Sequence, residues 1–185
     1  MADYPLIVFG TANARVPLTV VRDVLVTEGY PAGFGMAVAG EATDEEMSDP
    51  RWEIAFLRWP APEVHEVALI EVLSREEDEE EDHLISQHLA RIARLRDAAG
   101  RMIVAEHLNR TRILYTVQVL PALLADDDHA AWAALDVLLR FLSQTSDGII
   151  YAEAEGYCDT DGELLLAETD DLNPADSDVG QFAGY

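Results

Sequence analysis

Short apolar runs and helix-periodic stretches alternate along the chain, and this alternation constrains the fold more than any other feature of the sequence. The apolar runs at 5–10 and 51–60 are bounded by glycine or proline, as buried strands commonly are. Between them, Pro17 opens a stretch with apolar residues on one helical face, which Gly29 ends. With a further strand at 33–40, the first sixty residues predict a β-α-β-β unit.

The alternation continues from residue 64 with two longer helices. The order of elements between residues 64 and 155 is β-α-β-β-α-β, which resembles the ferredoxin-like split βαβ arrangement. In this interpretation Gly100 ends the first helix, and Asn109-Arg110 forms a two-residue hairpin turn. The predicted strands are 64–75, 101–108, 111–120 and 149–158, and the predicted helices run from the acidic stretch 76–82 to about Ala99 and from the aspartates 126–128 to about Ser146.

These elements predict one α+β domain that spans residues 1–168. We expect a largely antiparallel sheet that carries about three helices on one face, because a sheet must bury its apolar side against another layer. The remaining residues, 169–185, are acidic and rich in turn formers, and we expect them to form a mobile tail.

The charge of the chain restricts its partners. Thirty-six Asp and Glu residues stand against 12 basic residues, giving a formal net charge of -24, and every basic residue is arginine. Contacts to phosphate come mainly from Lys and Arg, so this balance argues against nucleic acid and anionic membranes as partners. It favours a basic protein partner, whose attraction weakens in salt. The composition also fits two origins without a partner, since arginine without lysine is typical of GC-rich bacterial genomes and acidity serves solubility or salt adaptation.

Targeting and redox features point to a soluble cytoplasmic protein. The first ten residues, MADYPLIVFG, carry no positive segment, and no apolar run approaches the roughly 18 residues that a membrane helix needs. Cys158 is the single cysteine, which excludes an internal disulfide and a thiolate zinc cluster.

Motifs for catalysis and metal binding are missing from the sequence. It contains neither a G-x-S-x-G nucleophile motif nor a phosphate-binding P-loop. The five histidines are scattered, and two of them, His83 and His88, are five residues apart, which does not match a zinc-binding pair. We therefore expect no cofactor, no metal and no catalytic residue, and the sequence favours a non-enzymatic role.

Glu106 is the one carboxylate that suggests otherwise. If Asn109-Arg110 is a hairpin turn, Glu106 lies on a strand face that is otherwise apolar. A buried carboxylate has a raised pKa, as a general acid or base requires, although a position near the turn also gives access to water. An enzyme or small-ligand binder that uses Glu106 is therefore a second hypothesis.

The stretch CDTDGELLLAE, at 158–168, fits two structures. Asp161-Gly162 between apolar runs is a strong signal for a tight β-hairpin, and that register pairs Tyr157 with Leu166. The spacing also resembles an EF-hand-like calcium loop over 157–168. Asp159, Asp161 and Glu168 then fall at positions three, five and twelve, but Tyr157 stands where an aspartate is expected. Calcium binding is the third hypothesis.

The hairpin register creates a charge conflict, because it sets Glu155 opposite Glu168. Like charges in opposite positions destabilise a sheet, so either the pairing ends before residue 168 or a positive group lies over that face. The same face suggests a surface for a basic partner. Its candidate residues are Glu153, Glu155, Tyr157, Asp159, Asp161 and Glu168.

Such a surface fits a non-enzymatic interaction or inhibitor protein. Inhibitors and immunity proteins directed at nucleases are often acidic, because they compete with nucleic acid for a basic site. The oligomeric state has no signal in the sequence. An immunity-like protein with a basic partner is therefore the leading hypothesis.

Overall fold

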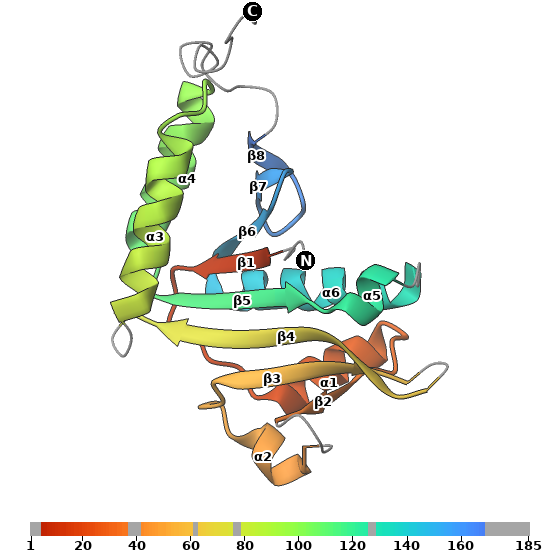
Figure 1. Cartoon of the computed structure of the whole chain (residues 1–185). Helices are drawn as coiled ribbons and strands as arrows, with labels where there is room; N and C mark the ends of the chain where they lie inside the picture. Colours follow the sequence, from red (N-terminus) through yellow and green to blue (C-terminus); the bar gives the residue numbers. More distant parts are fainter. Residues whose placement is uncertain (1–4, 37–41, 61–62, 76–78, 126–128, 169–185) are drawn as a thin grey trace, which may run out of the picture.

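The computed structural model describes residues 5–36, 42–60, 63–75, 79–125 and 129–168. In this part of the chain, eight strands form one antiparallel sheet in the order β2-β3-β4-β5-β1-β6-β7-β8 (Figure 1). The predicted class, an α+β fold with a largely antiparallel sheet, is confirmed. The strands are β1 (Pro5–Gly10), β2 (Gly33–Gly35), β3 (Ile54–Trp59), β4 (His65–Ser74), β5 (Ile113–Val119), β6 (Gly148–Ala152), β7 (Gly156–Cys158) and β8 (Leu164–Ala167). The helices are α1 (Leu18–Thr27), α2 (Asp44–Ser48), α3 (Glu79–Ile92), α4 (Ala98–Arg110), α5 (Pro121–Ala125) and α6 (His129–Ser146).

The sheet separates two cores, because alternate residues of each strand point to opposite faces. In β1, Leu6 and Val8 join a core with the apolar stripes of α1 and α6, whereas Ile7 and Phe9 join a core with α3 and α4. Figure 1 shows α1 and α6 behind the strands and the α3–α4 pair at the left. The prediction of about three helices on one face is therefore wrong, since helices pack on both faces.

The main difference from the sequence-based fold is at residues 101–108, which form the middle of α4 and not a strand. Val104 and Leu108 are fully buried, four residues apart on one helical face, while Met102, Ile103 and Glu106 are exposed. The β-α-β-β-α-β order predicted between residues 64 and 155 is not present, because two consecutive helices connect β4 to β5.

Gly100 lies in the first turn of α4 and does not end a helix. The Asp97 carboxylate caps this helix by accepting hydrogen bonds from the amides of Ala99 and Gly100, at 3.0 and 3.1 Å. A Cβ atom on Gly100 would come within 2.5 Å of the Leu165 carbonyl oxygen. The glycine is needed so that α4 can approach β8 closely.

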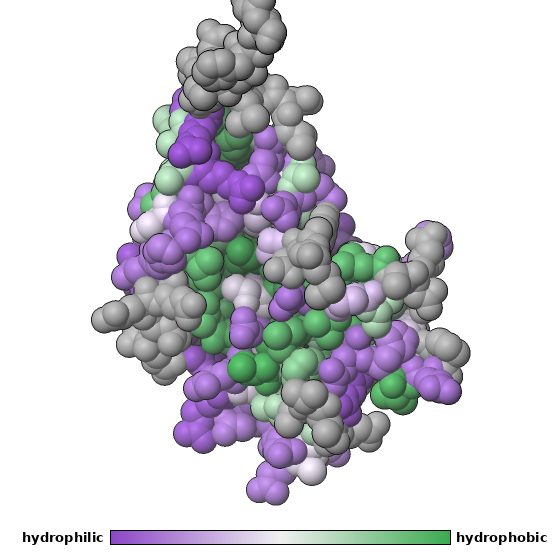
Figure 2. All heavy atoms as spheres, viewed as in Figure 1, coloured by the Kyte–Doolittle hydropathy of each residue, from purple (hydrophilic) through white to green (hydrophobic). Residues whose placement is uncertain are grey.

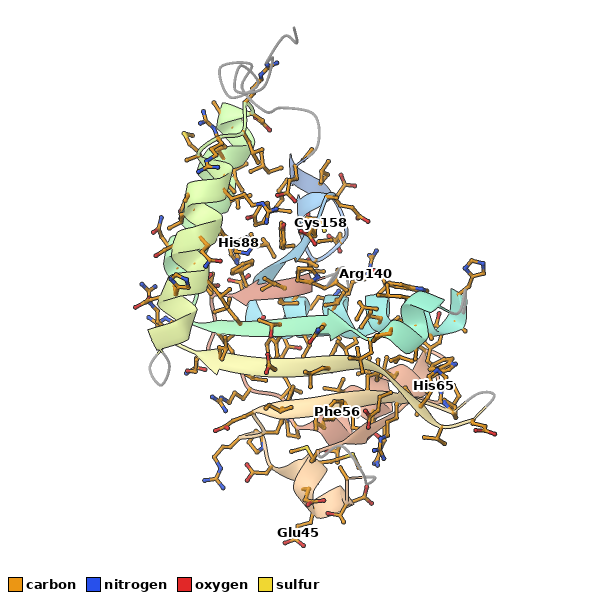
Figure 3. The ribbon with its side chains drawn as sticks, viewed as in Figure 1. Glu45, Phe56, His65, His88, Arg140 and Cys158 are labelled. Carbon is orange, nitrogen blue, oxygen red and sulfur yellow. The ribbon has the colours of Figure 1, made fainter. Side chains whose placement is uncertain are left out.

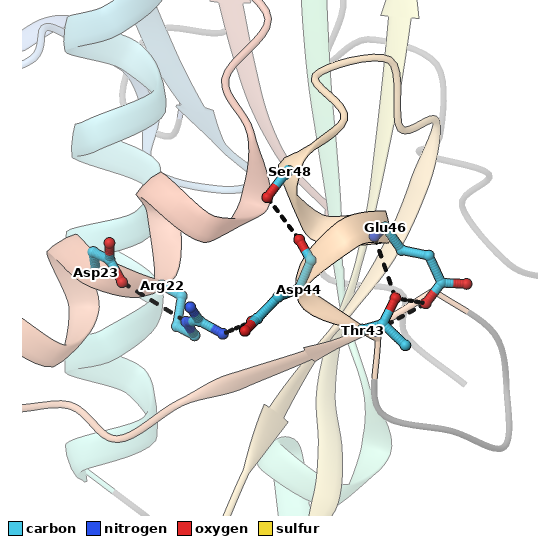
Figure 4. Close-up of polar contacts among 6 residues, drawn as sticks. All are labelled: Arg22, Asp23, Thr43, Asp44, Glu46 and Ser48. Atoms are coloured by element: carbon cyan, nitrogen blue, oxygen red, sulfur yellow. Dashed lines mark hydrogen bonds and ion pairs between the residues drawn. The ribbon is translucent and has the colours of Figure 1, made fainter.

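A short helix, α2, occupies part of the predicted acidic connector. Thr43 and Glu46 form a reciprocal capping box, in which the Glu46 amide donates to Thr43 Oγ1 and the Thr43 amide donates to Glu46 Oε2 (Figure 4). Arg22 of α1 donates to Asp44 at 2.8 Å and so links α2 to α1. The buried side chain of Met47 then closes the core behind β2 and β3.

The last part of the sheet consists of two hairpins. The strand predicted at 149–158 breaks after Ala152, and the chain returns as β7 through a turn in which Ala154 and Gly156 have φ angles of 67° and 116°. The hairpin predicted between β7 and β8 is confirmed, with Tyr157 paired with Leu166 as expected.

Some predicted features lie outside the described residues. These are the tail at 169–185, the beginning of the acidic run at 76–78 and the capping aspartates at 126–128. Within the described ranges, no helix combines the length and the apolar character that crossing a membrane requires.

Candidate functional site

The half of the sheet formed by β3, β4 and β5 has one face without a helix over it in the described part of the chain. The core beneath α3 and α4 takes buried residues from β1 and from β5 to β8, but none from β2 or β3. The α3–α4 pair therefore covers only one end of this face. We call the uncovered part the open face, defined by Ile54, Phe56, Leu69, Glu71, Leu73, Thr116 and Gln118.

The open face is apolar where a solvated sheet face is usually polar. In β3, Ala55 and Leu57 are fully buried on the opposite side, while Ile54 is 44% exposed and Phe56 is half-buried. Phe56 pairs with Leu69 across the strands, and both side chains are only partly covered. Figure 2 shows hydrophobic residues gathered in the middle of this view and bordered by hydrophilic ones. An uncovered apolar surface of this kind is typical of an interaction site.

A groove of about 390 Å³ runs along the open face beside α3. Glu71 is its only charged lining residue in the described part of the chain; its neighbour across the strands, Thr116, donates a long hydrogen bond of 3.4 Å to Glu71 Oε2. The residues that line the groove are Pro5, Ile7, Glu71, Leu73, Leu84, Thr116, Val117 and Gln118. The groove thus offers apolar walls and one exposed carboxylate, an arrangement that suits an apolar segment carrying a cation.

The acidic surface predicted at the C-terminal hairpin is not assembled as one patch. Tyr157 is buried at 1% exposure, and Glu168 is turned into a cluster of polar contacts. Asp159 uses its carboxylate inside the turn, where Oδ1 accepts hydrogen bonds from the amides of Asp161 and Glu163. Of the six candidates, only Glu155 and Asp161 are exposed, and Glu153 is half-buried.

The charge conflict predicted at Glu168 is resolved by Arg91 of α3. Arg91 forms an ion pair with Glu168, and its guanidinium lies 5.6 Å from the centre of the Tyr151 ring. The second carboxylate oxygen of Glu168 accepts hydrogen bonds from the Tyr151 hydroxyl and the Ala154 amide, both at 3.0 Å. Arg91 is therefore the positive group over this face, and Glu168 fastens the end of β8 to α3 and to the β6–β7 turn.

Glu168→Gln is expected to lower the free energy of unfolding by about 1–2 kcal/mol, because it removes the charge that faces Arg91 on a side chain only 13% exposed. Chemical denaturation measures the change. Arg91→Gln made on the Glu168→Gln background should cost less than Arg91→Gln alone. Equal costs in the two backgrounds would show that the ion pair contributes nothing.

His88 sits at the centre of an aromatic cluster between α3 and strands β6 and β7 (Figure 3). Its Nδ1 shares a hydrogen bond of 2.6 Å with the Tyr157 hydroxyl, and its ring packs edge-on against Phe9 and Tyr151. Burial, with a smaller effect of the Arg91 charge, lowers the pKa of His88 to about 4. Burial also raises the pKa of both tyrosines. The cluster is thus held neutral at the imidazole and the two phenols.

The sequence carries a weak signal for this cluster. His88 lies three residues after Ile85 and four before Ile92, on the helical stripe whose apolar members are buried. A histidine at that spacing belongs to the buried side of α3. Nothing in the sequence identifies Tyr157 as its partner, because the two residues are 69 positions apart.

The two remaining hypotheses, Glu106 and calcium, find no support in the described geometry. Glu106 is exposed on α4, so it is not the buried carboxylate that the hairpin interpretation predicted. Residues 157–168 form a β-hairpin without flanking helices, and Glu168, the twelfth residue, binds Arg91 instead of pointing into the loop. In the part of the chain that the structure describes, no three His, Cys, Asp or Glu side chains are grouped so that they could hold a metal ion.

Comparison with known proteins finds no matching family model, no matching curated protein and no matching solved structure. Function is therefore inferred from the open face, its groove and the charge of the chain.

Proposed function

We propose that the protein is an acidic interaction protein of the inhibitor or immunity type, which binds a basic protein partner through the open face. The observation that carries this proposal is the uncovered apolar surface around Phe56 and Leu69, next to a groove in which Glu71 is the charged residue. A buried apolar centre supplies most of the affinity of a typical interface.

The charge of the chain supports a basic partner over a neutral one. A net charge of -24 attracts cationic proteins over long distances and raises their association rate. Glu71 then gives a local reason for specificity, because a Lys or Arg of the partner can reach its carboxylate while neighbouring apolar side chains cover Phe56 and Leu69. The same chemistry suits inhibition of a nuclease, whose active surface is basic.

A peptide that alternates leucine and lysine is a suitable first probe, since it presents apolar groups on one side and cations on the other when extended. We expect the full-length protein to bind this peptide and the affinity to fall as ionic strength rises from about 0.01 M to about 0.15 M. Fluorescence anisotropy of labelled peptide measures both effects. Phe56→Ser and Glu71→Gln should each weaken binding about tenfold, equivalent to about 1.4 kcal/mol.

Two matched variants on α4 control for general effects of hydrophobicity and charge. Met102 is 73% exposed and Glu106 is exposed, so Met102→Ser and Glu106→Gln make similar changes away from the open face. Both are expected to bind like the wild type. Equal losses in Glu71→Gln and Glu106→Gln would reduce the interaction to unspecific charge attraction and contradict the proposal. A loss confined to Asp161→Asn would instead place the partner on the C-terminal hairpin.

A further inference from the structure

We propose that a second site, at the end of the sheet where β4 finishes and β5 begins, binds a small phosphate-bearing anion. This end lies at the left of Figure 1, below the α3–α4 pair. A pocket of about 670 Å³ opens there, within the range of small-molecule sites. Its lining residues are Thr11, Ala12, Asn13, Arg75, Asn109, Arg110, Thr111 and Arg112.

The charge of this pocket is opposite to that of the chain. Three of the 12 arginines line it, and none of the lining residues in the described ranges is acidic, although the chain holds 36 Asp and Glu. With three acids for every arginine, neutralised arginines would be the ordinary outcome. A cationic pocket in such a chain therefore indicates a ligand that is itself an anion.

Two of the arginines lie opposite each other in the β4–β5 ladder. The Arg75 amide donates to the Arg112 carbonyl at 3.2 Å, which continues the pairing of Ser74 with Ile113. Like charges at opposite positions destabilise a sheet unless an anion lies between or over them. The arrangement carries a cost that a bound anion would remove.

Internal contacts account for Arg75 but not for its neighbours. Arg75 Nη1 donates to the carbonyls of Asn109 and Thr111, at 3.2 and 3.4 Å, and Nε lies 3.2 Å from Asp82. Arg110 has a partial structural reason, because a cation is favourable at the C-terminal end of a helix. Arg112 is exposed, and within the described ranges neither it nor Arg110 has an acidic side-chain partner.

The chemistry of the pocket favours phosphate carried by a small molecule. A guanidinium presents a planar pair of donors that matches the oxygens of a phosphate, and two or three such groups suit a doubly charged anion. A long polyanion such as nucleic acid is disfavoured, because the rest of the chain carries a large negative charge. The site is separate from the open face, so it does not depend on the proposed partner.

Isothermal titration of the full chain with inorganic pyrophosphate tests this site, with sodium chloride of equal ionic strength as the blank. We expect saturable binding of one pyrophosphate per chain. Arg112→Gln should weaken it at least tenfold, and the double variant Arg110→Gln/Arg112→Gln should abolish it. Arg96→Gln removes the same charge from an exposed arginine between α3 and α4, and this variant should bind within twofold of the wild type.

Three results would overturn the inference. These are a flat titration with the wild type, equal weakening by Arg96→Gln and Arg112→Gln, and citrate binding as tightly as pyrophosphate. The first would show that the pocket holds no such anion, the second that binding is unspecific, and the third that carboxylates are the ligand class. Thermal unfolding of each variant without ligand confirms that it is folded, since Arg110 and Arg112 are both exposed.

Discussion

Replacing Gly156 with alanine is expected to lower the free energy of unfolding by about 3–5 kcal/mol, the largest single effect in the chain. Gly156 has a φ angle of 116°, a conformation that residues with a Cβ atom rarely adopt. A Cβ atom there would lie 2.1 Å from the Leu166 carbonyl oxygen. Because that oxygen belongs to the backbone of β8, relief requires β7 and β8 to separate, and Glu168 would then lose its contacts with Arg91 and Tyr151.

Two other glycines separate the causes of this effect. Gly29 has a φ angle of 90° but nothing within 4 Å of a Cβ atom, so Gly29→Ala reports backbone strain alone, about 1 kcal/mol. Gly33 has neither a positive φ angle nor a close neighbour, so Gly33→Ala should be close to neutral. Chemical denaturation of the three variants gives the comparison. A loss for Gly156→Ala no greater than that for Gly29→Ala would contradict the close packing of β7 against β8.

His88→Ala is expected to cost about 3 kcal/mol near neutral pH, for two reasons that add. The variant leaves a space where the imidazole packs edge-on against Phe9 and Tyr151. It also leaves the Tyr157 hydroxyl without its 2.6 Å hydrogen bond inside the core. Chemical denaturation at constant pH measures the loss.

The same histidine makes stability depend on pH. Its pKa is about 4 in the folded protein and 6.5 in the reference state, so below pH 6.5 the unfolded chain takes up a proton that the folded chain does not. Stability is therefore complete above pH 6.5 and falls towards pH 4, by up to about 3 kcal/mol from this residue alone. Carboxylates that titrate in the same range contribute to wild type and variant alike.

The difference between the two unfolding profiles isolates the histidine. His88→Ala lacks the proton uptake of His88, so its disadvantage relative to the wild type should shrink as the pH falls from 6.5 towards 4. A constant difference across this range would show that His88 is not held neutral by burial.

Local sequence patterns are sufficient for the elements with a clean period. The apolar runs of β1 and β4 and the stripes of α1 and α6 appear where the periodicity placed them. They are not sufficient for α4, because the segment RMIVAEHL has β-branched residues and follows a glycine, while packing of Val104 and Leu108 decides for a helix. The Thr43-x-x-Glu46 capping signature of α2 is present in the sequence, but the acidic residues around it favoured a connector.

The candidate sites depend on long-range arrangement, which one sequence does not give. The hairpin register correctly exposed the conflict between Glu155 and Glu168, and with it the need for a positive group. It did not identify Arg91, since α3 reaches that face only through the packing of His88 and Ile92. The open face has a similar origin: the strand pattern of β3 is visible in the sequence, but the absence of a helix over Phe56 in the described part of the chain is not.

Mapping of the bound peptide on the isotopically labelled protein by NMR tests the central claim most directly. If the open face binds a basic partner, the amide signals that shift on addition of the leucine–lysine peptide should cluster at Ile54, Phe56, Leu69, Glu71 and Thr116. Shifts confined to Glu155, Asp161 and their neighbours, or spread evenly over acidic residues in all parts of the chain, would contradict it.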